Sequence, residues 1–306
     1  MLEVAIMIEG QNGLNWPRWQ KIAAAVEMLG FSGLYRSDHY TNSNPPDIES
    51  LELWVSLTWL ASHTRRIEFG PLVSPVSFRQ PTITARMASA VDDLSGGRLT
   101  LGLGAGWQER EHTNYGWDLL NIAGRFERFE EGLKIISHLL QNESPLDFDG
   151  KFYHLKEAVL LPRPARPGGP PILIGGNGRK LTLPLAARYA SEWNAVYLTP
   201  QKFVELNKML DELLAANHRQ PNSVRRSLMH GCYFGKDEAT LQRKLGARDP
   251  AKLREHGVVF GTASEVVDQL GKFAEAGVGR IMLQWLDLDD LDGLAAMAQS
   301  VLPQVK

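Results

Sequence analysis

The sequence predicts a single (β/α)8 TIM barrel over residues 1–306, and three observations support this. Eight short apolar runs alternate with amphipathic segments, which is typical of parallel strands joined by helices. Most residues that could carry chemistry directly follow one of these runs, as Asp38 and His39 do. The length also fits, because single-domain α/β barrels often exceed 200 residues. Such barrels carry their active sites at the carboxyl ends of the strands, so the pattern also predicts where the site lies.

The first half of the chain contains four predicted strands and the helices between them. Pro17 suits the first turn of the first helix, Gly30 ends that helix, and Gly96 ends the third. The predicted strands cover residues 2–9, 32–37, 66–73 and 98–103, and the predicted helices cover residues 16–29, 48–64 and 81–95.

The segment from residue 104 to residue 170 is longer than one strand–helix unit needs. It contains a predicted helix at 125–140, a hairpin turn at 148–153 and a proline-rich stretch at 161–171. An insertion at this place is either a wall of the active site or a solvated excursion, and the sequence leaves both open.

The second half repeats the alternation. A second insertion is expected after the seventh strand, because the helical segment 238–256 is interrupted near Asp249-Pro250. Thr262 is a good helix-start residue and Gly277 a good stop. The predicted strands cover residues 172–174, 190–197, 225–234 and 280–285, and the other predicted helices cover residues 181–189, 200–216, 262–276 and 288–302.

Composition narrows the class of protein. The formal net charge of −2 gives no reason to expect nucleic acid or an anionic membrane as a partner. The single cysteine, Cys232, excludes an internal disulfide and fits a reducing cytoplasm. No signal-like segment opens the chain and no apolar run reaches 18 residues, so a cytoplasmic protein is expected.

Asp38 and His39 follow the second strand. A histidine can move protons near neutral pH, and a nearby carboxylate can raise its pKa. Adjacent residues of an extended chain point to opposite sides, however, so these two need not touch. A loop histidine that only bonds a backbone carbonyl is an equally good interpretation.

Two further strand ends have unusual composition. Pro71 and Pro75 around the end of the third strand indicate irregular backbone such as a bulge, or a plain proline-rich loop. The fourth strand ends in GLGAGW at 102–107, a weak phosphate-loop signal because the third fingerprint glycine is absent. Glu109 and His112 could share a helix face and bind a metal, but no second such pair exists and no metal site is predicted.

The fifth strand ends in the strongest phosphate signal. A glycine-rich turn that leads into a helix offers unpaired N–H groups and the positive end of the helix dipole. Arg179 and Lys180 add two cations directly afterwards. The alternative is a tight turn, although three glycines in four residues exceed what a turn requires. The turn consists of Gly175, Gly176, Asn177 and Gly178.

Taken together, these segments resemble the luciferase-like monooxygenase superfamily of flavin- and deazaflavin-dependent barrels. The resemblance covers nearly the whole chain. Two of its stretches, 148–153 and 171–178, are similar to the branch of probable oxidoreductases that use a 5-deazaflavin, coenzyme F420. The stretches are 37–39 (SDH), 95–107 (SGGRLTLGLGAGW), 125–131 (RFERFEE), 148–153 (FDGKFY) and 171–178 (PILIGGNG).

The resemblance implies a role for each matching residue. His39 would lie against the ring near its reactive carbon, with Asp38 alongside. Val73-Ser74 would carry a non-prolyl cis peptide whose bulge supports the back of the ring. Glu109 matches a position that some relatives use as an acid beside the substrate. The implied cofactor-binding residues are His39, Val73, Ser74, Ala105, Gly106 and Trp107 at the ring and ribityl chain, and Gly175, Gly176, Asn177 and Gly178 at the phosphate.

The implied reaction is hydride transfer between the deazaflavin coenzyme and a small organic substrate, with His39 for the proton. Two alternatives stay open. One is an FMN-dependent monooxygenase that uses oxygen, and the other is a flavin-binding barrel without turnover. The family habit also suggests a homodimer.

Overall fold

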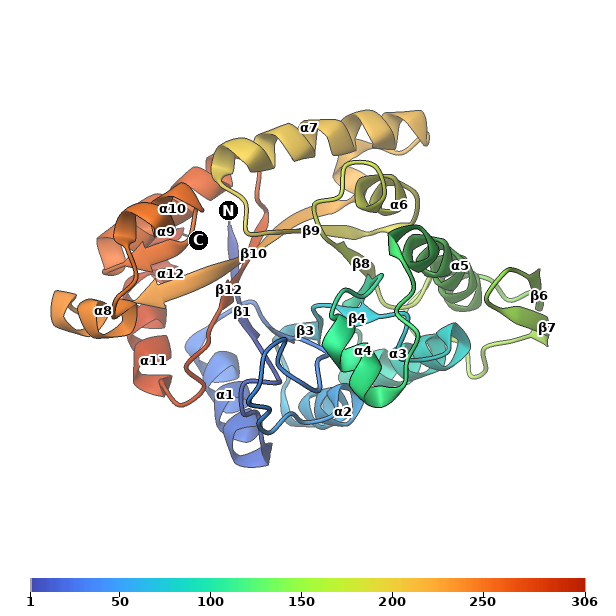
Figure 1. The fold of residues 1–306 in the computed structure, drawn as a ribbon, viewed down its shortest axis with the longest axis horizontal. Helices are drawn as coiled ribbons and strands as arrows, with labels where there is room; N and C mark the ends of the chain where they lie inside the picture. The colour runs from blue at the N-terminus through green and yellow to red at the C-terminus, as the bar shows by residue number, and fades with distance from the viewer. Residues whose placement is uncertain (1, 306) are drawn as a thin grey trace.

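A ring of parallel strands surrounded by helices dominates the computed structural model, which describes residues 2–305 (Figure 1). The hydrogen-bonded order is β3-β2-β1-β12-β10-β9-β8-β5-β4. β3 and β4 are two halves of one strand interrupted at Leu72 and Val73, and Phe69 of β3 also pairs with Leu99 before β5. The path contains nine strands. With β3 and β4 counted as one, the barrel has eight strands, and the pairing of Phe69 with Leu99 closes the ring. The predicted (β/α)8 barrel is confirmed.

The observed elements follow the predicted order with small changes at their ends. The barrel strands are β1 Glu3–Ile8, β2 Gly33–Arg36, β3 Glu68–Pro71, β4 Ser74–Pro75, β5 Leu101–Gly104, β8 Ile172–Gly175, β9 Glu192–Val196, β10 Arg225–Phe234 and β12 Arg280–Gln284. The surrounding helices are α1 Trp16–Leu29, α2 Leu53–His63, α3 Pro81–Ser95, α5 Ile122–Gln141, α6 Thr182–Tyr189, α7 Pro200–Ala216, α10 Ala263–Glu275 and α11 Leu291–Ser300. The chain also forms a 3-10 turn, η1 Pro221–Ser223, and a short helix, α12 Leu302–Val305.

Two of the helix starts that differ from the prediction are set by side-chain caps. α2 begins at Leu53 rather than residue 48, since the carboxylate of Glu52 accepts a hydrogen bond from the N–H of Val55. The last predicted helix begins at Leu291, where Asp290 accepts from Gly293, and it divides into α11 and α12. Both caps are local, and neither changes the barrel.

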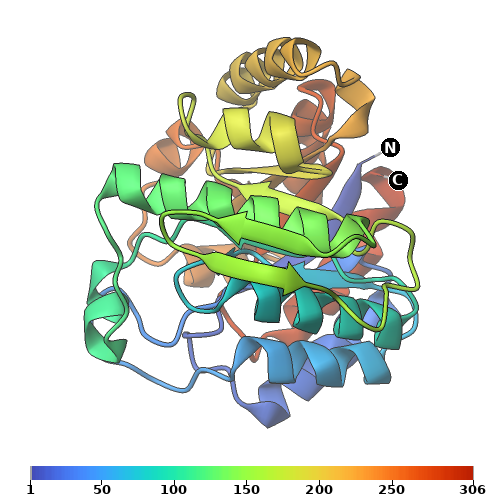
Figure 2. The same cartoon turned by 90° about the vertical axis from the view of Figure 1, so that its right-hand side faces the viewer.

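The two predicted insertions are present. The first contains a short helix, α4 Glu109–Tyr115, and an antiparallel hairpin of β6 Leu146–Asp149 and β7 His154–Ala158. Figure 2 shows the hairpin lying outside the barrel beside α5. The second contains α8 Glu238–Leu245, α9 Pro250–Glu255 and β11 Val259–Gly261, which pairs in parallel with the end of β10. β11 was not predicted from the sequence, and α4 was anticipated only in that Glu109 and His112 could share a helix face.

The chain ends meet at the amino end of the barrel. β1 pairs with β12, and the N–H of Leu2 bonds the carbonyl of Val305 (Figures 1 and 2). Arg280 is fully buried there and forms ion pairs with Glu3, Glu68 and Glu192. This charged cluster occupies the amino end of the barrel interior, where a small polar cavity of about 270 Å³ lies beside Glu68 and Glu192.

An apolar layer fills the middle of the barrel. Its buried residues are Ala5, Met7, Tyr35, Leu72, Leu173, Met229 and Met282. A second, larger core lies between the strands and the helices. No helix among residues 2–305 is long and apolar enough to cross a membrane.

Candidate active site

A cavity of about 720 Å³ opens at the carboxyl ends of the strands. This volume lies within the range of small-molecule and cofactor sites. Of the residues predicted for catalysis or cofactor binding, seven line it: His39, Val73, Ala105, Gly106, Trp107, Gly175 and Gly176. The others, Asp38, Ser74, Glu109, Asn177 and Gly178, do not line it. Further lining residues include Met7, Glu9, Gln11, Ser37, Leu72, Gln108, Glu111, His112, Arg125, Asn194, Tyr197 and Met229.

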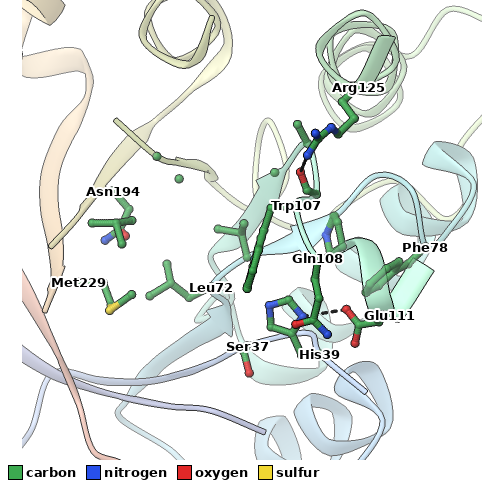
Figure 3. Close-up of a pocket in the computed structure, with 18 of the residues that line it drawn as sticks. Ser37, His39, Leu72, Phe78, Trp107, Gln108, Glu111, Arg125, Asn194 and Met229 are labelled. Atoms are coloured by element: carbon green, nitrogen blue, oxygen red, sulfur yellow. Dashed lines mark hydrogen bonds and ion pairs between the residues drawn. The ribbon is translucent and has the colours of Figure 1, made fainter. Parts of the chain in front are cut away.

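His39 is held by Glu111 rather than by its neighbour in the sequence. The Nδ1 atom of His39 lies 2.8 Å from the Oε2 of Glu111, which is fully buried (Figure 3). The other carboxylate oxygen accepts hydrogen bonds from the backbone N–H groups of Tyr40 and Thr41. Glu111 therefore fixes both the ring and the backbone that carries it. The described residues offer Nε2 of His39 no partner, so this nitrogen is left to the cavity.

The surroundings of His39 favour its protonated form. Burial alone lowers the pKa of the imidazole, because it penalises the charged state. The hydrogen bond and negative charge of Glu111 act in the opposite direction, with further help from Glu9 and Asp38, and the pKa is raised overall. An imidazolium that stays protonated at higher pH can donate a proton into the cavity.

Replacing Glu111 with glutamine is expected to lower the pKa of His39. Glutamine keeps the shape but removes the charge, so burial becomes the dominant influence and the pKa falls below its ordinary value of 6.5. The measurement is an NMR pH titration of the His39 ring. The matched control is Glu109→Gln on the same helix, which is expected to leave this titration unchanged. An unaltered His39 pKa in Glu111→Gln would contradict the assignment.

Asp38 points away from the cavity, as alternation along the chain requires. Its carboxylate is 2% exposed and accepts hydrogen bonds from Ser74 Oγ at 2.7 Å and Arg79 at 2.5 Å. Arg79 also pairs with Glu52 at the start of α2. Asp38 thus anchors the loop behind His39, and its charge acts on the histidine from a distance.

One face of α4 supplies buried polar groups, of which Gln108 and Glu111 were not predicted from the sequence. Gln108, Glu111 and His112 are spaced i, i+3 and i+4 and are all buried, whereas Glu109 is exposed. Gln108 donates to both oxygens of Thr41, the carbonyl and the hydroxyl. This spacing of polar residues directly after a strand was the signal that could have identified Glu111. The geometry places the buried carboxylate two residues after the position implied by the resemblance.

His112 is the second histidine of the cavity, and its environment is opposite to that of His39. Burial lowers its pKa, and its Nδ1 donates to the Gln108 carbonyl at 2.7 Å. Its Nε2 consequently accepts from the Ser77 hydroxyl at 2.8 Å. The site therefore combines one histidine that favours the charged form with one that stays neutral.

The back wall of the cavity is the bulge between β3 and β4. A non-prolyl cis peptide joins Leu72 to Val73, one residue earlier than the resemblance implied. Val73 packs into space left by glycines: a Cβ on Gly104 would lie 2.6 Å from its Cγ2, and one on Gly175 would lie 3.0 Å from its Cγ1. Gly102 is likewise required by the approach of the Pro71 carbonyl. These glycines shape the wall, which explains the GLGAGW pattern without a phosphate.

The predicted phosphate turn lies beside the cavity between β8 and α6. Asn177 shapes it by donating to the Val196 carbonyl and accepting from the Val196 N–H. Gly178 lies close to Thr182, because a Cβ on it would lie 2.7 Å from that Oγ1. Arg125 on α5 lines the cavity, has no carboxylate partner among the described residues and donates to the carbonyl of Gly106. Arg125 begins the 125–131 stretch of the family resemblance, but no role was predicted for it.

Trp107 forms the outer wall. It is 62% exposed, and its ring meets that of His39 edge to face, with centroids 5.6 Å apart (Figure 3). A large exposed aromatic at a cavity mouth is a natural surface for a flat ligand. Within residues 2–305 no group of three or more histidine, cysteine or acidic side chains is arranged to hold a metal ion.

Comparisons with known proteins agree on one group. The family model described as luciferase-like monooxygenase matches residues 3–254. The F420-dependent glucose-6-phosphate dehydrogenase of Kineococcus radiotolerans is 23% identical over 317 residues, covering 93% of this chain and 91% of that protein.

Solved structures of similar fold include proteins with either cofactor. An F420-dependent secondary alcohol dehydrogenase in complex with an F420-acetone adduct superposes with a TM-score of 0.85 at 17% identity, over 100% of this chain and 99% of that one. The oxygenating constituent of 3,6-diketocamphane monooxygenase of Pseudomonas putida, in complex with FMN, gives a TM-score of 0.76 at 15% identity, over 100% and 99%. These likenesses show the shared fold.

Proposed function

The chain belongs to the luciferase-like monooxygenase family, and from that premise we propose that it is a coenzyme F420-dependent oxidoreductase. It transfers a hydride between the deazaflavin and a small organic substrate. The observation that carries the proposal is His39, held by Glu111 beside a wall shaped for a flat ring. The relative from Kineococcus radiotolerans, an F420-dependent glucose-6-phosphate dehydrogenase that this chain matches over 91% of its length, supports the same choice.

The residues present fit such a coenzyme. Val73 and the glycines around it make a wall of backbone and one branched side chain, and Trp107 faces the site across His39. The turn at 175–178 and the cation of Arg125 suit a phosphate, which prefers backbone N–H groups and guanidinium donors. A bound deazaflavin would supply the carbon that gives or takes the hydride.

The side chains of this chain supply the proton and the orientation. When the substrate is reduced at carbon by the hydride, the oxygen or carbon that gains electron density takes a proton from Nε2 of His39. In the opposite direction, the same nitrogen accepts the proton while the hydride leaves the substrate. Glu111 holds the imidazole ring of His39 in place and stabilises its protonated form. The apolar floor and Trp107 exclude water from the reacting atoms.

Binding measurements with purified protein test the cofactor choice. We expect coenzyme F420 to bind at least about tenfold more tightly than FMN, seen as quenching of ring fluorescence, and its reduction or oxidation to be followed by absorbance. The FMN-bound structure of similar fold supports the rival, an oxygen-using monooxygenase. Preference for FMN together with oxygen consumption would establish that rival. Tight ring binding without turnover on any substrate would instead favour a storage barrel.

We also propose a cytoplasmic homodimer. Its only cysteine, Cys232, is a free and buried thiol, which suits a reducing compartment. The packed helices α2 and α3 expose Val55, Ile83 and Leu94, which a second copy could cover. Light scattering should give twice the mass of the chain, and a monomeric mass would contradict the proposal.

A further inference from the structure

One polar side chain lies at the floor of the cavity, within an apolar layer. Along β9, alternation turns Glu192, Asn194 and Val196 toward the barrel interior and Trp193 outward against Phe203 of α7. Asn194 is 1% exposed and lines the cavity with Met7, Leu72 and Met229. In Figure 3 it lies with Met229 on the side opposite Gln108 and Glu111.

The hydrogen bonds around Asn194 fix which way its amide faces. Ser227 donates its hydroxyl proton to the Trp193 carbonyl, so its oxygen is an acceptor toward Asn194. The Nδ2 of Asn194 donates to that oxygen at 2.9 Å and also approaches the sulfur of Met282. The Oδ1 of Asn194 has no hydrogen-bond partner among residues 2–305. A buried acceptor without a donor is costly, and such groups in native proteins call for an explanation.

We propose that Asn194 recognises the cofactor ring: its Oδ1 accepts a hydrogen bond from the imide N–H that flavin and deazaflavin rings share. This inference rests on the proposed function. Because Asn194 and His39 belong to opposite walls, an anchored N–H edge sets how the reactive part of the ring meets His39. A ring turned end for end would separate its N–H from this acceptor and leave the Oδ1 of Asn194 unpaired.

The test compares cofactor rings that carry the imide N–H with a ring in which a methyl group replaces that hydrogen. Fluorescence titration measures the dissociation constants of FMN and its N3-methyl analogue, with coenzyme F420 as a third ligand. Wild-type protein should bind FMN about tenfold more tightly than the methylated ring. In Asn194→Leu, which keeps the volume but removes the acceptor, FMN and F420 should each bind about tenfold more weakly, while the methylated ring changes by less than about twofold.

Ser227→Ala is the matched variant. It removes the group that orients the amide, so it should weaken FMN binding less than Asn194→Leu and narrow the preference for the N–H ring. Equal binding of both rings by wild-type protein overturns the inference and needs no variant. Unchanged FMN affinity in a folded Asn194→Leu also overturns it, because the methyl group is then excluded by size alone. A protein that binds none of the rings overturns the proposed function itself.

Discussion

Replacing His39 with alanine is expected to lower kcat by about a hundredfold while leaving coenzyme affinity within about threefold. The imidazole is the group in the cavity whose pKa is raised by a buried carboxylate and whose second nitrogen is left to the ligand. The wall, the glycine turn and Arg125 remain intact in this variant, so binding should persist. The measurements are steady-state kinetics with coenzyme F420 and a fluorescence titration of the same preparation.

A matched control separates the loss of catalysis at His39 from a general effect of replacing a histidine with alanine. His154 is exposed on the hairpin, where it pairs with Asp149 outside the cavity, so His154→Ala should retain wild-type kinetics. The pH profile gives a second readout. Since the raised pKa keeps His39 protonated to higher pH, the activity that depends on its proton should decline only above the ordinary histidine range. Full activity of His39→Ala would remove His39 from the mechanism.

Replacing Gly70 with alanine is expected to have the largest effect on stability. A Cβ at this position would lie 1.9 Å from the backbone carbonyl oxygen of Thr100, at the place where β3 meets β5. Backbone cannot rotate away as a side chain can, so the strands must separate and disturb the wall above them. We expect about 3 kcal/mol of destabilisation and a fall in Tm of roughly 6 °C or more.

The control is another glycine in open space. Gly271 lies within α10, and a Cβ on it would meet nothing within 4 Å. Gly271→Ala should therefore keep or slightly raise Tm, because alanine favours helix by about 1 kcal/mol over glycine. Thermal unfolding followed by circular dichroism measures both variants. A Gly70→Ala protein with the wild-type Tm would contradict the close approach of the two strands at this position.

Most of the fold prediction rested on the hydrophobic periodicity of the sequence. Eight apolar runs between amphipathic segments require parallel strands with crossover helices, and this holds whatever the side chains later contact. Helix ends were less certain, because caps such as Glu52 and Asp290 depend on one side chain each. The short β11 was missed because three residues carry too little pattern, and its pairing with β10 is a tertiary event.

The partners within the site could not come from sequence alone. His39 is followed 72 residues later by the carboxylate that holds it, and Asp38, its neighbour, faces away. The glycines after the fourth strand read as a ligand loop, whereas Pro71 and Val73 from another strand require them. The barrel and the end at which the site lies could both be predicted from the sequence, since both follow from local alternation. Which residues meet depends on the folded barrel, because contacts between strand ends are set by packing across the barrel rather than by distance along the chain.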